Sequence, residues 1–72
     1  MIPKGGVRVR VKLQQIREAN GYTQKQFADV ADISRSHYSQ IETGEKNPSL
    51  KLAIRIKRVL GYAGDDIFDN VV

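Results

Sequence analysis

The chain has 72 residues, of which 40% are hydrophobic and 28% charged, and it contains no cysteine. A chain of this length can build only one small core, so we expect a single compact domain. The lack of cysteine excludes disulfides, thiolate metal sites and cysteine nucleophiles. A net charge of +4 favours a polyanionic partner such as nucleic acid or an acidic membrane surface.

The ends of the chain are expected to differ from its middle. Residues 1–8, with Pro3 and the Gly5-Gly6 pair, are predicted to form a flexible leader, residues 9–69 the folded domain, and residues 70–72 a short tail. No secretory signal is visible at the N-terminus, and no apolar run approaches the roughly 20 residues that span a bilayer. We therefore expect a cytoplasmic protein without a membrane partner.

The first helix is predicted to begin at about Val9 or Val11. Residues 7–12 alternate like a strand, but Val9, Leu13 and Ile16 also recur at helical spacing. A lone strand would lack a partner, because no second strand pattern follows, and this favours the helix. Gly21 is expected to end it in the left-handed conformation.

A second helix is predicted from Gln24 to about Ala31. Thr23 and Gln26 have the spacing of a capping box, in which each side chain bonds the backbone N–H of the other residue. Asp32 can adopt the left-handed conformation of a tight turn at low cost.

Ser34 is expected to cap a third helix that Gly44 ends. Two short capped helices separated by about three residues predict a helix-turn-helix, which places its second helix in the major groove of DNA.

A fourth helix is predicted to open with Asn47 as its cap and Pro48 as its first residue, Ser49 being the alternative cap, and to end at Gly61. Its core-facing positions are expected to be Leu50, Ala53, Ile56 and Leu60. A short fifth helix over residues 65–68 should close the core. The acids at Asp65, Asp66 and Asp69 are expected to favour a helix N-terminus rather than to bind a cation.

The third helix carries the predicted binding chemistry. At 100° per residue, Tyr38 and Ile41 point towards the core, and the opposite face has short, polar, uncharged side chains at Ser36, Ser39, Gln40 and Thr43, with Arg35 at its N-terminal edge. Such side chains suit the edges of DNA bases, since Gln pairs with adenine, Arg with guanine, and Ser or Thr with either kind of partner. The alternative is an ordinary solvated helix face.

At this point the sequence resembles the Cro and phage-repressor type helix-turn-helix regulators of bacteria and phages, the lambda-repressor-like or XRE family. The matching residues are Ile16-Arg17-Glu18, Gly21-Tyr22-Thr23-Gln24, Phe27-Ala28, Ile33-Ser34-Arg35-Ser36, Ser39-Gln40-Ile41-Glu42, Gly44, Asn47-Pro48-Ser49-Leu50 and Leu60-Gly61. Together they cover residues 12–68 in the family's order and spacing. The chain departs from the family at Asp32, where glycine is usual.

The resemblance implies a five-helix bundle with separate sets of DNA-binding residues. Base contacts are expected from Arg35, Ser36 and Gln40, to which the outward geometry adds Ser39. Contacts to the phosphate backbone are expected from Gln24, Lys25, Thr43, Lys46 and Asn47. Arg17 and Glu42 are expected to form a structural ion pair between the first and third helices.

The predicted function is that of a transcriptional regulator, and more narrowly a repressor, which binds a palindromic double-stranded DNA operator as a homodimer. The dimer surface is expected to include Ile67, Phe68, Val71 and Val72. The alternative is an antitoxin-like or other protein-interaction module with secondary DNA binding. An enzyme is not expected, because one histidine without cysteine or a phosphate loop supplies no catalytic pair. No metal, cofactor or small-molecule effector is expected.

Overall fold

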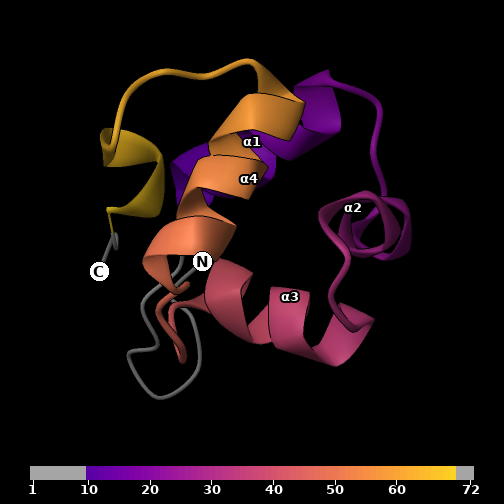
Figure 1. Ribbon diagram of the computed structural model, residues 1–72. Helices are drawn as coiled ribbons and strands as arrows, with labels where there is room; N and C mark the ends of the chain where they lie inside the picture. Colours follow the sequence, from indigo (N-terminus) through magenta and orange to yellow (C-terminus); the bar gives the residue numbers. More distant parts are fainter. Residues whose placement is uncertain (1–9, 70–72) are drawn as a thin grey trace, which may run out of the picture.

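The computed structural model describes residues 10–69, and within them it is entirely helical (Figure 1). The α-helices are α1 (Val11–Ala19), α2 (Gln24–Ala31), α3 (Arg35–Thr43) and α4 (Leu50–Leu60), and a single 3-10 turn, η2 (Asp66–Phe68), follows them. The all-helical prediction is confirmed. The leader and tail predicted at residues 1–8 and 70–72 lie outside the described residues.

The prediction of five helices is wrong. The segment expected to form the fifth helix is the 3-10 turn η2, three residues long. Its N-cap residue, Asp65, makes no side-chain capping bond, and Asp69 is already extended. So few residues provide too few hydrogen bonds to offset the cost of nucleating an α-helix.

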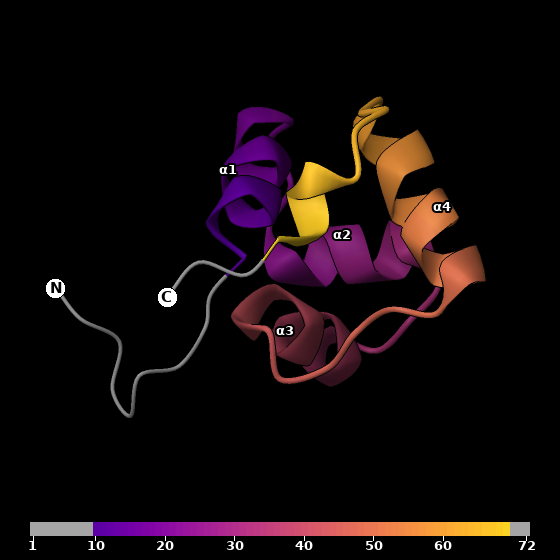
Figure 2. The same ribbon diagram turned by 90° about the vertical axis from the view of Figure 1, so that its left-hand side faces the viewer.

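The core is formed by apolar side chains from every element. The fully buried members with the largest side chains are Leu13, Phe27, Tyr38, Ile41, Ile56 and Ile67. α2 packs against both α3 and α4, while α1 packs against α3 and η2. In Figures 1 and 2, α3 lies along the lower edge of the molecule, with the chain between α3 and α4 running beside it. Within residues 10–69, this arrangement leaves one side of α3 uncovered by another element.

The starts of α2 and α3, and the turn between them, are set by local side-chain and backbone chemistry. Thr23 Oγ1 accepts from the backbone N–H of Gln26, and Gln26 Oε1 accepts from the N–H of Thr23, so the predicted capping box is present. Ser34 Oγ likewise accepts from the N–H of His37 at the start of α3. Asp32 has φ 61° and ψ 44°, the left-handed conformation predicted for it. The caps thus define where α2 and α3 begin, and the left-handed Asp32 forms the turn of a helix-turn-helix.

The start of α4 differs from the prediction. Ser49, the alternative, is the cap, and its Oγ accepts from the N–H of Leu52. Asn47 does not cap the helix, which begins at Leu50, and its Oδ1 accepts instead from the side chain of Arg10. The expectation that Leu50 faces the core is also wrong, since Leu50 is 78% exposed. At 100° per residue, Leu50 lies about 120° around the helix from the buried Ile56, whereas Leu52 and Leu60 lie close to it.

The acids near η2 pair with lysines rather than cap a helix. Lys57 Nζ donates to Asp65 Oδ1 at 2.5 Å, and Lys12 Nζ donates to Asp66 Oδ2 at 2.6 Å. The hydroxyl of Tyr62 also donates to Asp66. Because each pair has at least one side chain with 47% or more of its surface in solvent, each contributes little to stability, but together they connect α1 and α4 to the C-terminal turn.

Candidate nucleic-acid interface

The outward side of α3 is a polar face opposite the buried side chains of Tyr38, Ile41 and Glu42. Ser36, Gln40 and Thr43 follow one another at the spacing of one helix face, about 145° to 165° from the middle of the buried side at roughly 100° per residue. Ser36 and Arg35 are exposed, and Ser39, Gln40 and Thr43 are half-buried. Of the predicted base-contacting residues, Ser36 and Gln40 therefore share the outward face, Ser39 lies beside it, and Arg35 lies on the flank, about 65° from the middle of the buried side by the same spacing.

Two of the predicted phosphate-contacting residues lie in the first turn of α2. Gln24 Nε2 donates to Glu42 Oε1 at 3.0 Å, so one N–H of its amide is already used inside the protein. Lys25 is exposed, with its ammonium 3.4 Å from Asp29 one turn further along. The free backbone N–H groups and partial positive charge at this helix end favour an anion.

The other predicted phosphate-contacting residues follow the open side of α3. Thr43 Oγ1 donates to the Gln40 carbonyl at 3.1 Å and lies 3.3 Å from Glu45 Oε1. A phosphate would have to displace one of these bonds to accept from Thr43. Lys46 and Asn47 are both exposed and lie in residues 44–49, which we call the α3–α4 loop.

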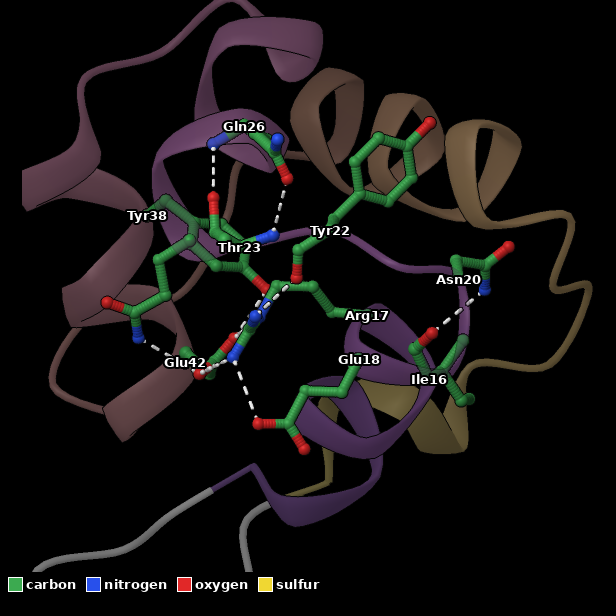
Figure 3. Close-up of polar contacts among 10 residues, drawn as sticks. Ile16, Arg17, Glu18, Asn20, Tyr22, Thr23, Gln26, Tyr38 and Glu42 are labelled. Carbon is green, nitrogen blue, oxygen red and sulfur yellow. Dashed lines mark hydrogen bonds and ion pairs between the residues drawn. The ribbon is translucent and has the colours of Figure 1, made fainter.

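Arg17 and Glu42 face each other across the interior, and Figure 3 shows the polar groups gathered round them. Arg17 Nε donates to Glu42 Oε2 at 2.8 Å and Nη2 to Oε1 at 3.2 Å, a two-point contact. Arg17 Nη1 also donates to the Tyr22 carbonyl at 2.6 Å. The Tyr38 hydroxyl donates to Glu42 Oε2 at 2.6 Å. The network thus joins α1, the start of α2, and α3.

The pKa values of this network follow from burial and hydrogen bonding. Burial alone would raise the pKa of Glu42, but the hydrogen bonds from Arg17, Tyr38 and Gln24 outweigh it and hold that pKa below its ordinary value. Burial, followed by the hydrogen bond to Glu42, raises the pKa of the Tyr38 phenol far above its ordinary range. The hydrogen bond to Glu42 raises the pKa of Arg17. The carboxylate and guanidinium are therefore charged at neutral pH.

Two residues of these networks were missed by sequence reasoning. Tyr38 was assigned to the core alone, although its spacing of four residues from Glu42 on one helix is a signal for their hydrogen bond. Arg10 is almost fully buried and bonds the α3–α4 loop. No local pattern indicates this, because its side-chain partners lie 31 to 58 residues away in sequence.

Across residues 10–69, no group of three or more histidine or acidic side chains is placed to hold a metal ion. None of the helices in the described part of the chain is long and apolar enough to cross a membrane.

Comparison with known proteins agrees with this geometry. The model of the helix-turn-helix family matches residues 13–67, which include all four α-helices except the start of α1. The chain therefore belongs to the helix-turn-helix family of transcriptional regulators of the XRE type, and the resemblance found in the sequence is confirmed.

Several members of the family are similar over most of this chain. The uncharacterized HTH-type transcriptional regulator YqaF of Bacillus subtilis is 33% identical over 88% of this chain and 83% of its own length. An uncharacterized HTH-type transcriptional regulator of Methanocaldococcus jannaschii is 39% identical over 79% of this chain and 86% of its own. The SPbeta prophage-derived regulator YonR of B. subtilis is 33% identical, and this chain spans only 50% of its length.

The fold is also found in a solved structure. The clp gene regulator ClgR from C. glutamicum superposes with a TM-score of 0.73 at 25% sequence identity, over 82% of this chain and 76% of that one.

Proposed function

We propose that the protein binds double-stranded DNA in a sequence-specific manner and regulates transcription, with α3 inserted in the major groove. The observation that carries the proposal is the outward face of α3, where Ser36, Gln40 and Thr43 lie opposite the core at the edge of the molecule (Figure 2). These side chains are short and uncharged and offer both donors and acceptors to base edges.

Charged and polar groups on both sides of α3 support the proposal. Lys25 and the N-terminus of α2 precede α3 in the sequence, and Lys46 and Asn47 follow it. We infer that these groups hold the phosphate backbone and set the register of the protein on DNA, while Arg35, Ser36, Ser39 and Gln40 determine which sequence is preferred.

Variants of Gln40 and Lys46 test whether base-contacting and phosphate-contacting residues are separate. If Gln40 pairs with an adenine edge, Gln40→Ala should cost about 1 to 3 kcal/mol on the preferred duplex and almost nothing on random DNA. Lys46→Ala should weaken all duplexes similarly and reduce the slope of log affinity against log salt by about 0.9 for each phosphate that the protein no longer neutralises.

The preferred duplex is first selected from random DNA with the unmodified protein. Each variant is then titrated by fluorescence anisotropy on the preferred and scrambled duplexes at several salt concentrations. The control is Lys51→Ala, which removes the same charge from an exposed position on α4. Equal losses of affinity for Gln40→Ala on the two duplexes would mean that α3 does not contact bases.

We further propose that the protein binds a palindromic site as a homodimer. Ser36, Gln40 and Thr43 span about 10 Å along the helix, which covers roughly three base pairs and is too little for a specific site. Two subunits should therefore bind half-sites about 34 to 36 Å apart. A complex with one protein per duplex at saturation, measured by sedimentation, would exclude the dimer.

The dimer surface expected from the sequence needs a correction. Ile67 is fully buried in the core of its own chain, so it is not available to a second subunit. Phe68 is half-buried and packs against that core. Val71 and Val72 lie outside the described residues.

A further inference from the structure

Arg10, immediately before α1, is a buried cation that connects distant parts of the fold. Its side chain is almost completely enclosed, and its backbone N–H donates to the Glu42 carbonyl at 2.9 Å. The acceptors of its guanidinium are the carbonyls of Phe68 (2.8 Å), Ile41 (2.6 Å) and Lys46 (2.8 Å), and Oδ1 of Asn47 (2.5 Å). Four hydrogen bonds occupy four of the five guanidinium N–H groups.

None of these partners is a carboxylate, which distinguishes Arg10 from the buried Arg17. Burial lowers the pKa of Arg10, and this reflects the cost of removing its charge from water. The Ile41 carbonyl lies in the last turn of α3, where helix carbonyls carry partial negative charge. A buried charge is often no more stabilising than an apolar side chain of similar volume. Stability alone therefore does not explain why an arginine is buried here, and the role of Arg10 is better inferred from the groups that it bonds.

The bonds hold the α3–α4 loop against the end of α3. Lys46 is fixed from both sides, since its N–H donates to the Gln40 carbonyl at 3.1 Å and its carbonyl accepts from Arg10. The side chain of Asn47 is oriented as well. Because Asn47 Oδ1 faces Arg10, its amide nitrogen remains free to donate in another direction.

We propose that Arg10 is a positioning residue for DNA binding. Its guanidinium holds the α3–α4 loop so that the Lys46 ammonium and the Asn47 amide meet the phosphate backbone in register with the bases contacted by α3. This inference rests on the proposed function and adds to it a residue that does not itself touch DNA.

A double-mutant cycle between Arg10 and Lys46 tests the proposal. Arg10→Met keeps an unbranched apolar stem but removes the charge and the forked donors, and Arg10→Lys removes the fork but keeps the charge. The affinity for the selected duplex is measured across a salt series for each variant, with and without Lys46→Ala. We expect Lys46→Ala to lower the salt slope by about 0.9 in the unmodified background and by almost nothing in either Arg10 variant.

Arg55→Met is the matched control. It removes the same charge and also a hydrogen bond to the end of a helix, since Arg55 Nη1 donates to the Ala31 carbonyl at 2.8 Å. That bond connects α4 to α2 and does not involve the α3–α4 loop. In this background Lys46→Ala should keep its full effect, and the two changes should be additive.

Amide hydrogen exchange in the free protein gives a second measurement that does not depend on DNA. The Lys46 amide should lose protection in Arg10→Met and Arg10→Lys but not in Arg55→Met, while the amides of α2 stay protected in all three. Circular dichroism verifies the fold of each variant, and Arg10→Lys decides the result if Arg10→Met does not fold.

The outcomes separate this inference from the proposed function. A full effect of Lys46→Ala in a folded Arg10 variant, or an unchanged Lys46 amide, would overturn the positioning role. Failure of the unmodified protein to prefer any selected duplex would instead overturn the proposed function.

Discussion

Glu42 accepts four hydrogen bonds from three side chains, two of them from Arg17 and one each from Gln24 and Tyr38. Arg17 and Glu42 are both almost fully buried, with 7% and 5% of their side chains exposed. Removing one partner would leave the other charge buried without compensation, whereas removing both would leave a smaller penalty.

We therefore expect Arg17→Ala and Glu42→Ala each to lower the free energy of unfolding by up to roughly 3 to 5 kcal/mol. The double variant should lose less than the sum of the two. Urea denaturation of the four proteins at neutral pH measures the cycle. The control is the exposed pair of Lys25 and Asp29 on α2, whose single alanine variants should differ from the unmodified protein by less than about 0.5 kcal/mol. Additive losses of stability for Arg17 and Glu42 would contradict the coupling.

At the scale of elements, the turn between α2 and α3 depends on one residue. Asp32 is the only non-glycine residue of the described chain with positive φ. An L-residue in this conformation pays a steric cost that glycine avoids, although aspartate pays less than most. The turn sets the angle at which α3 leaves α2, so it also sets how α3 is presented.

Asp32→Gly should raise the free energy of unfolding by up to about 1 kcal/mol, and Asp32→Ala should lower it by about 1 kcal/mol. Asp29, in the regular part of α2, is the control. There the order should reverse, with glycine less stable than alanine by about 1 kcal/mol. Urea denaturation of the four variants gives the comparison, and the same order at both positions would show that the left-handed conformation at Asp32 carries no strain.

At the scale of the whole molecule, η2 completes the core rather than offering a surface. Ile67 is fully buried, whereas Leu50 at the start of α4 is 78% exposed. Ile67→Ala should therefore cost about 2 to 5 kcal/mol of stability. Leu50→Ala, which removes a similar apolar volume, should change it by less than about 0.5 kcal/mol.

Thermal unfolding at two protein concentrations distinguishes this explanation from one based on dimers. The loss of stability for Ile67→Ala should be independent of concentration, because the side chain packs within its own chain. A loss that diminishes at high concentration would mean that Ile67 contributes to an interface between subunits.

The features that the sequence alone determined are those whose partners lie within a few residues. The capping box of Thr23 and Gln26, the cap at Ser34 and the left-handed Asp32 all depend on backbone groups nearby in the chain, so their spacing was sufficient. The outward side of α3 was predictable for the same reason, because helix periodicity places Gln40 about 130° around the helix from the midpoint between Tyr38 and Ile41.

Tertiary structure alone decided the features whose partners are distant. Asn47 has the chemistry of a cap, but it is bonded by Arg10 from 37 residues away, and Ser49 caps α4 in its place. Arg10 itself connects residues up to 58 positions apart. Local patterns carry no information about such contacts, because they exist only once the chain has brought its ends and its loops together.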